Sequence, residues 1–309
     1  MSLYSIIIPV YNSEHTLIEL YERIKKVFEE MLKEEFELIL VNDSSRDNSW
    51  QVMKKLHNLD SRVKIINLSK NFGQHSALLC GLHYFQGDFV IMMDDDLQHP
   101  PEEIPKLIKA LEDNPEIDVI FGNYIVKHHS WYRNFGSLII NKISTIIIKR
   151  EEKIRITSFR IMRADLAHKI VDINIQQPRI GNLIMHSTNR VMAIDIEHNA
   201  RVKGKSGYHL NRLIKDSLSI IISNSILPLK LISSFGIILS FISILIGVFF
   251  IIRYFVQGIS VAGWTSLIVL ITFFSGFILF TLGIIGEYLI RILMEAKKMP
   301  VYIEREVIL

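Results

Sequence analysis

The 309-residue chain contains a single cysteine, Cys80, which excludes an intramolecular disulfide and a zinc site built from several cysteines. Cys80 stands in an apolar stretch, so we expect a buried thiol of low reactivity. The excess of basic over acidic residues is only +3. Proteins dedicated to nucleic acid usually carry a dense basic patch that neutralises phosphates, so nucleic acid is not an expected partner.

The first residues, MSLYSIIIPVYN, lack the basic start of a secretory signal sequence and contain only a short apolar run. We interpret them as a strand and expect this part of the chain in the cytoplasm. Apolar residues are abundant instead, at 49% of the total, and the mean hydropathy is positive. A wholly soluble protein rarely has this composition, so membrane segments are expected.

Short apolar segments alternate with amphipathic helical patterns over the first 121 residues. The expected strands are 5–10, 36–41, 63–68, 88–93 and one that begins at 119, and the expected helices are 16–33, 49–58, 74–85 and 100–112. This alternation is typical of βαβ units. It predicts an α/β fold with a Rossmann-like, mostly parallel sheet.

Three consecutive aspartates, Asp94–Asp96, follow the fourth expected strand, and ligands of open α/β sheets bind beyond the carboxyl ends of strands. In an extended segment Asp94 and Asp96 share one face, while Asp95 points away. Gln98 joins the first face if the chain stays extended. Close carboxylates repel each other unless a cation neutralises them, and oxygen ligands favour Mg²⁺ or Mn²⁺ over zinc. A bound diphosphate would complete the shell of the metal.

An acidic helix N-cap before Pro100 is the alternative interpretation of this cluster, because helix N-termini favour aspartate. It accounts for one aspartate but hardly for three. Asp43 follows the second strand in the same way and is a candidate acceptor of hydrogen bonds from a base or ribose, with a turn or capping role as the alternative. After the first strand, Tyr11 is a candidate for stacking on a base, and Ser13 is open to a capping role.

Two long runs near the C-terminus carry no formal charge. Leu231–Ile252 has 22 residues and Trp264–Gly286 has 23. At a rise of about 1.5 Å per residue the first spans ~33 Å, enough for the hydrocarbon core of a bilayer. The short link Arg253–Gly263 predicts an antiparallel hairpin. The alternative, a buried hairpin in a soluble core, would need a very large protein around it.

Basic residues flank the outer ends of the two runs, whereas Arg253 alone flanks the inner link. The positive-inside rule therefore places both outer ends and the N-terminal part in the cytoplasm. Trp131–Lys149 is open to two interpretations, a core helix or a helix in the membrane interface, and its apolar content favours the interface. Tyr208–Leu229 is similar.

Several motifs together cover nearly the whole chain. They are IIIPVYNSE at 6–14, VNDSSRDNS at 41–49, LSKNFGQHSALLCG at 68–81, MDDDLQHPPEEIP at 93–105, RVKGKSGY at 201–208, GEYLIRI at 286–292 and MPVYI at 299–303. With these motifs the chain resembles the family 2 glycosyltransferases, which have the GT-A fold. The resemblance is to the polyprenyl-phosphate branch, which includes dolichol-phosphate mannose synthase, bactoprenol glucosyltransferase and undecaprenyl-phosphate formamido-arabinose transferase.

The resemblance implies roles for individual residues. The implied nucleotide-binding residues are Pro9, Tyr11, Glu14, Asp43, Asp94 and Asp95. The implied metal ligands are Asp96, Asp94 and Gln98. Arg133, Arg201 and Ser206 are implied at the acceptor phosphate or the diphosphate, and Asp94, Asp96, Arg133 and Arg201 form the implied catalytic set.

The implied function is transfer of a sugar from a nucleotide sugar, UDP-linked by analogy, to polyprenyl (undecaprenyl) phosphate with inversion, dependent on Mg²⁺ or Mn²⁺. The product would serve cell-envelope glycans. The expected location is the cell (inner) membrane, spanned more than once, and a homo-oligomer such as a tetramer is expected. One alternative is a processive polysaccharide synthase, although its Gln-x-x-Arg-Trp motif is absent from the sequence. The other is a non-catalytic membrane scaffold that binds nucleotide sugar.

Three positions depart from the family pattern: Ser158 replaces an acidic residue, Tyr124 an arginine and Gly207 a lysine. They leave the donor sugar and the details of phosphate binding open. The predicted domains are a GT-A domain at 1–206, in which 131–149 is a candidate interface helix, an amphipathic segment at 207–229, a membrane hairpin at 230–294 with spans near 231–254 and 264–290, and a cytoplasmic tail at 295–309.

Overall fold

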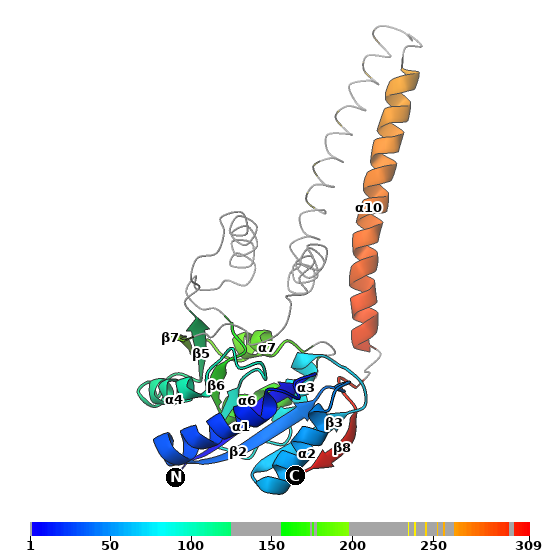
Figure 1. The fold of residues 1–309 in the computed structure, drawn as a ribbon. Coiled ribbons are helices and arrows are strands. Elements are labelled where there is room, and N and C mark those ends of the chain that lie inside the picture. The colour runs from blue at the N-terminus through cyan, green and yellow to red at the C-terminus, as the bar shows by residue number, and fades with distance from the viewer. Residues whose placement is uncertain are drawn as a thin grey trace. The chain divides into compact units, whose positions relative to one another are not determined.

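A computed structural model describes residues 2–124, 156–173, 175, 178–197, 263–296 and 300–309, with a few isolated positions between 234 and 256. The chain divides into two compact units. The first contains a β-sheet with its helices, and the second contains a long helix near the C-terminus (Figure 1).

The first unit is built on an eight-stranded sheet with the order β7-β5-β6-β4-β1-β2-β3-β8. The strands are β1 (Leu3–Val10), β2 (Glu35–Asn42), β3 (Val63–Leu68), β4 (Phe89–Met92), β5 (Val119–Tyr124), β6 (Arg160–Arg163), β7 (Val191–Ile196) and β8 (Glu304–Ile308). The neighbours β1–β2, β1–β4, β2–β3 and β5–β7 are parallel. Strand β6 runs antiparallel to β4 and β5, and β8 runs antiparallel to β3. The predicted α/β class is confirmed, but the predicted mostly parallel sheet is corrected to a mixed one.

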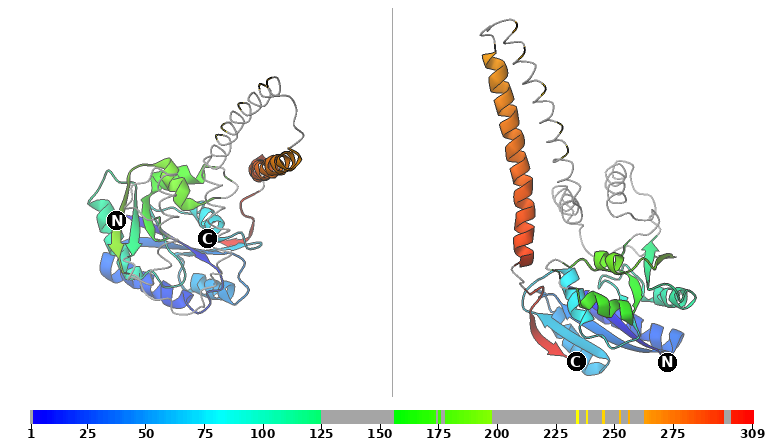
Figure 2. Two further views of the ribbon diagram at one scale, coloured as in Figure 1. Left: turned by 90° about the horizontal axis from the view of Figure 1, so that it is seen from above. Right: turned by 180° about the vertical axis from the view of Figure 1, so that it is seen from behind.

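Helices cover both faces of this sheet (Figures 1 and 2). One face carries α1 (Leu17–Lys26), its π-helical continuation η1 (Val27–Leu32), α2 (Ser49–Leu59) and α4 (Ile104–Glu112), which follows the 3₁₀ turn η2 (Pro101–Glu103). The other face carries α3 (Gln74–Leu82), α6 (Ala164–Val171) and α7 (Ile180–Ser187). Each face has its own apolar core, so the sheet is the middle layer of three.

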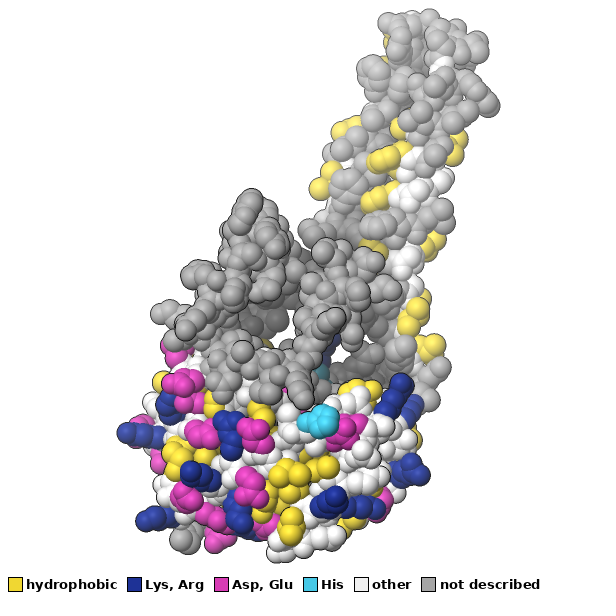
Figure 3. Space-filling model, in the orientation of Figure 1, with side chains coloured by type: hydrophobic (Ala, Val, Ile, Leu, Met, Phe, Trp, Pro, Cys, Tyr) yellow, Lys and Arg dark blue, Asp and Glu magenta, His cyan; other side chains and the backbone are white. Residues whose placement is uncertain are grey.

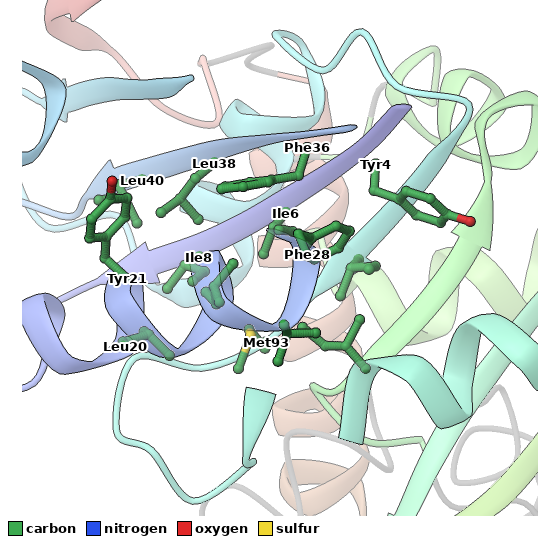
Figure 4. Packing of buried hydrophobic residues seen from close by; sticks show 14 of the residues in the cluster. Tyr4, Ile6, Ile8, Leu20, Tyr21, Phe28, Phe36, Leu38, Leu40 and Met93 are labelled. Atoms are coloured by element: carbon green, nitrogen blue, oxygen red, sulfur yellow. The ribbon is translucent and has the colours of Figure 1, made fainter. Parts of the chain in front are cut away.

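The apolar spacing of α1 explains how it packs. Leu17, Leu20, Tyr21 and Ile24 lie on one helical face and are all buried. Around them, aromatic and aliphatic side chains from α1, η1 and the central strands interlock (Figure 4). The rings of Phe28 and Phe36 lie 5.1 Å apart, a distance typical of aromatic pairs. This packing fixes β1 and β2 side by side, and therefore fixes the loops at their carboxyl ends.

The last strand, β8, lies within the segment that the sequence predicts as a tail, residues 295–309. It pairs with β3 from Ile65↔Ile308 to Leu68↔Glu304. The Glu304 carboxylate accepts a hydrogen bond from Tyr84 at 2.9 Å, and the hydroxyl of Tyr302 lies 2.9 Å from Nδ1 of His83. The C-terminal segment is therefore bound to the edge of the sheet and to the residues that directly follow α3.

The second unit contains α10 (Trp264–Ala296), a helix of 33 residues. Its stretch Phe273–Ile290 has a mean hydropathy of 1.8, and none of it is buried. Apolar side chains line the exterior of this helix (Figure 3). Among the described residues it is the one helix long and apolar enough to cross a membrane. The predicted first span, apart from isolated positions, and the segments 131–149 and 207–229 lie outside the described residues.

Candidate active site

A cleft of about 330 Å³ opens where β1, β2 and β4 end. The loop between β3 and α3 completes its wall. The lining residues are Pro9, Val10, Tyr11, Asp43, Asn71, Gly73, Gln74, Asp94, Asp95 and Asp96. Six of these ten are among the site residues predicted from the sequence: Pro9, Tyr11, Asp43, Asp94, Asp95 and Asp96. The structure therefore brings the predicted strand-end residues into one cavity.

Backbone strain is concentrated in the loops around this cleft. Asn12, Ser44 and Leu97 have φ angles of 56°, 56° and 60°, in the left-handed region. Gly73 has a φ of 91°, which only glycine adopts without strain. Residues in this region cost roughly 1–3 kcal/mol each and cluster at functional sites. Each of the four follows a different parallel strand, so left-handed backbone conformations, strained at the three non-glycine positions, mark this edge of the sheet.

Asp94 is held at the bottom of the cleft by two side-chain donors. Gln74 donates from Nε2 to its Oδ1 at 2.5 Å, and Ser158 donates from Oγ to its Oδ2 at 2.6 Å. Burial raises the pKa of Asp94, and the nearby charge of Asp96 raises it further. The Ser158 hydrogen bond and the charge of Arg160 oppose this shift of the pKa.

Asp95 connects the end of β4 to the loop after β1. Its Oδ2 accepts a hydrogen bond from the backbone N–H of Tyr11 at 3.1 Å and another from the Ser13 hydroxyl. Burial raises the pKa of Asp95 to about 6, although both hydrogen bonds favour the carboxylate. The prediction that Asp95 points away is wrong, because its side chain lines the same cleft as Asp94 and Asp96.

A bend after β4 explains this correction. The chain is extended only to Asp94 and bends through residues 95–99, where Leu97 turns inward and is 2% exposed. The condition under which Gln98 would share a face with Asp94 is therefore not met. Gln98 is absent from the cleft lining, and its backbone N–H donates to Asp96 Oδ1 at 3.1 Å. Its role as a metal ligand stays a prediction.

The acidic residues fit a divalent cation whose ligands come partly from the protein and partly from a bound substrate. Within the described ranges no group of three or more histidine, cysteine, aspartate or glutamate side chains converges as a complete protein site. Mg²⁺ usually takes one or two carboxylates and completes its shell with water and substrate phosphates. Asp94 and Asp96, which line one cleft and interact electrostatically, supply such a partial set of ligands.

Asp43 stabilises the loop after β3, which forms another part of the cleft wall. Its two carboxylate oxygens accept the backbone N–H groups of Phe72 at 2.7 Å and Gly73 at 2.8 Å. Burial raises the pKa of Asp43, and these two hydrogen bonds lower it. Asp43 therefore has the structural role that was the alternative interpretation, because it joins the end of β2 to the loop after β3. The same side chain still lines the cleft.

The other predicted residues fall into two groups. Pro9 and Tyr11 line the cleft, and Tyr11 is 44% exposed, which leaves its ring accessible. Glu14 is not among the lining residues, and its Oε2 instead accepts the backbone N–H of Asn48 at 2.8 Å, at the start of α2. Arg133, Arg201 and Ser206 lie outside the described residues, as does Gly207.

Comparison with known proteins identifies the family. Residues 5–171, more than half of the chain, match the domain described as glycosyl transferase family 2. The chain belongs to this family.

Full-length relatives agree with this assignment. The glycosyltransferase YkcC of Bacillus subtilis is 33% identical to this family 2 glycosyltransferase, over 97% of this chain and 92% of the relative. A protein named undecaprenyl-phosphate 4-deoxy-4-formamido-L-arabinose transferase, from Proteus mirabilis, is 32% identical over 98% of this chain and 93% of its own length.

A solved structure supports the GT-A fold alone. Glucosyl-3-phosphoglycerate synthase from Mycobacterium tuberculosis, in complex with Mn²⁺, UDP and phosphoglyceric acid, aligns with a TM-score of 0.53 at 14% identity. The alignment covers 72% of this chain and 76% of that one.

Several groups of the glycosyltransferase site are not predicted from the sequence. Gln74, Asn71 and Gly73 belong to the motif LSKNFGQHSALLCG, which was noted but given no role. Its position directly after a strand was the available signal. Ser158 was noted as a departure, and its contact with Asp94 depends on the antiparallel pairing of β6 with β4. A four-residue strand of that kind has no periodic signal in the sequence.

Proposed function

We propose that this glycosyltransferase moves a sugar from a nucleotide sugar, UDP-linked, to polyprenyl phosphate, with inversion at the anomeric carbon. The observation that carries the proposal is the cleft itself, which Asp94, Asp95 and Asp96 line together with Tyr11 and Asp43. The name of the Proteus mirabilis relative supports the choice of acceptor. The product is proposed to serve cell-envelope glycans.

The acceptor needs little activation in this scheme. A phosphate monoester is largely ionised at neutral pH, because its second pKa lies near ~6. It can attack the anomeric carbon without a general base, and a single displacement inverts the configuration. This agrees with Ser158 in place of an acidic residue, since the Ser158 hydroxyl donates to Asp94 and is not a base at neutral pH.

The departing nucleotide diphosphate is the harder group to accommodate. Asp94 and Asp96 are proposed to hold a divalent cation, which when bound would neutralise the diphosphate charge. Gln74 and Ser158 keep the Asp94 carboxylate oriented into the cleft. Tyr11 is proposed to stack on the base, and buried Asp43 to fix the loop that forms the nucleotide wall.

We further propose that the chain crosses the bilayer twice. Strand β8, after α10, lies in the same sheet as β1 to β7, so the chain is on one side of the membrane before and after α10. If α10 spans the bilayer, an odd number of other crossings must lie between β7 and α10. Within that stretch Leu231–Ile252 is the one uncharged run of about 20 residues, the length that a crossing needs.

Cysteine labelling tests this topology, because Cys80 is fully buried and gives a low background. We expect a Gly263→Cys variant to react with a membrane-impermeant maleimide in right-side-out vesicles. An Arg305→Cys variant, in exposed β8, should react only in inverted vesicles. Labelling of both positions from the same side would contradict the hairpin.

Transfer assays test the reaction. Purified protein in nanodiscs that contain undecaprenyl phosphate is incubated with a panel of labelled UDP- and GDP-sugars. We expect one donor to give a monoglycosylated lipid phosphate whose anomeric configuration is inverted. A long polymer would indicate a processive synthase, and absence of turnover with every donor and acceptor would indicate a scaffold. Light scattering on the same sample tests the proposed homo-oligomer.

A further inference from the structure

Arg160 is a buried cation without an ion-pair partner among the described residues. It is the largest of their fully buried side chains, with 2% exposure, and its Nε has no hydrogen-bond partner there. Arg23, Arg62 and Arg190, by contrast, each form an ion pair of 2.6 or 2.7 Å with a carboxylate. An unpaired buried charge costs several kcal/mol. Arg160 therefore calls for an anion at its side.

Arg160 lies directly behind the acidic wall of the cleft. It is paired in register with Met92 of β4, two residues before Asp94. Because side chains alternate along β6, Arg160 is on the same face as Met162, which is covered by α3, α6 and α7. The charge of Asp94 acts on Arg160. The Asp94 oxygens accept hydrogen bonds from Gln74 and Ser158, and among the described residues no ion pair within 4.0 Å joins Asp94 to Arg160.

Two further basic side chains gather at this position. Arg179 directly precedes α7, and a Cβ placed on Gly181 would lie 3.7 Å from Nη1 of Arg160, so the first turn of α7 lies against the guanidinium. His75 follows Gln74 in α3. His75 is exposed to solvent on one side, yet partial desolvation and then the charges of Arg160 and Arg179 lower its pKa to about 4. His75 is therefore neutral at pH 7, and its ring can donate a hydrogen bond within reach of the field of two cations.

We propose that Arg160, Arg179 and His75 form a binding subsite for a phosphate oxyanion beside Asp94. Guanidinium groups bind phosphate through paired, charge-assisted hydrogen bonds, and a neutral imidazole adds one donor. Among the described residues, neither arginine has a carboxylate within ion-pair distance that would compete with the ligand.

The position of the subsite assigns it to the acceptor phosphate, an assignment that rests on the proposed function. In the sheet order β6-β4-β1-β2, Asp94 stands at the end of β4. Tyr11 and Asp43, which are proposed for the nucleotide, lie toward β1 and β2. Arg160 lies on the opposite side, on β6. A lipid phosphate bound there and a donor sugar held over the acidic residues would meet above Asp94.

The experiment measures the binding of the donor nucleotide and the use of the lipid acceptor separately, in full-length protein in nanodiscs. Arg179→Gln, which changes a half-buried side chain, is the main variant, and Arg160→Lys keeps the charge but removes the paired donors. Arg305→Gln in β8 is the control, because it removes the same charge away from the cleft. We measure KM for undecaprenyl phosphate, the Kd of UDP by calorimetry, and the rise in thermal midpoint caused by inorganic phosphate.

We expect Arg179→Gln and Arg160→Lys to raise KM for the lipid phosphate at least about tenfold, the loss of one to two charge-assisted hydrogen bonds, while the Kd of UDP changes less than about twofold. A tenfold weaker Kd for UDP with unchanged KM for the lipid would assign the subsite to the donor diphosphate and overturn the acceptor assignment. If neither quantity moves, the subsite is refuted.

The rise in thermal midpoint caused by inorganic phosphate tests the subsite independently of the proposed function. Inorganic phosphate should stabilise the unchanged protein, and the stabilisation should be lost in Arg179→Gln but kept in Arg305→Gln. If no lipid phosphate is ever glycosylated while this pattern holds, the proposed function fails and the oxyanion subsite stands. Equal stabilisation of all three proteins, or of none, would overturn the subsite.

Discussion

Asp96→Asn is expected to lower kcat for sugar transfer by about 10²- to 10³-fold, the cost of removing one group that stabilises developing charge. The substitution is nearly isosteric, so the amide can still accept the hydrogen bond that Gln98 donates to Asp96 Oδ1. It removes one of the two charges proposed to hold a divalent cation. The measurement is the initial rate of transfer of labelled sugar at saturating donor, acceptor and Mn²⁺ or Mg²⁺.

Asp113→Asn is the matched control. Asp113 is exposed at the end of α4, away from the cleft lining, so the same chemical change should leave kcat within about twofold. A chelator should abolish transfer by the unchanged enzyme, and added Mn²⁺ or Mg²⁺ should restore it. Full activity of Asp96→Asn at every metal concentration would remove Asp96 from the proposed mechanism.

Much of the central sheet could be predicted from the sequence. The first four strands are continuous buried runs, and Val63–Leu68 was predicted with the bounds that the structure has. The rule that ligands of open α/β sheets bind beyond the carboxyl ends of strands then marked the acidic residues, and Asp43 and Tyr11 follow two other strands in the same way. These predictions succeeded because both signals are local.

The parts that could not be predicted depend on contacts between distant segments. Strand β6 has four residues, and β8, with the sequence EREVI, has three charged ones, so both lack the apolar pattern of a central strand. The orientation of Asp95 depends on the left-handed turn at Leu97, a residue type that rarely adopts it. The environment of Arg160 arises only when β6 meets β4 and α7.

Removal of residues 301–309 is expected to expose Cys80 strongly to alkylation. This result would distinguish a docked strand from a free tail. A free tail would be dispensable, whereas β8 covers the open edge of β3 and contacts Cys80 of α3. Cys80 of α3 donates to Glu304 at 3.5 Å, and burial raises the pKa of its thiol, which suppresses the reactive thiolate. The truncated protein should therefore alkylate at Cys80 at least about tenfold faster, which corresponds to ~1.4 kcal/mol less protection against local opening.

Two glutamates of β8 make this test specific. Glu304→Gln weakens the acceptor of the Tyr84 hydrogen bond, and a hydrogen bond to a charged group is worth about 1.5–3 kcal/mol, so Cys80 alkylation should again accelerate about tenfold. Glu306→Gln breaks only an exposed ion pair with Lys54, worth about 0–1 kcal/mol, and should change the rate little. Because α3 begins at Gln74, the partner of Asp94, the truncation should also reduce transfer activity. Unchanged Cys80 reactivity and unchanged transfer in the truncated protein would mean that β8 does not support the cleft.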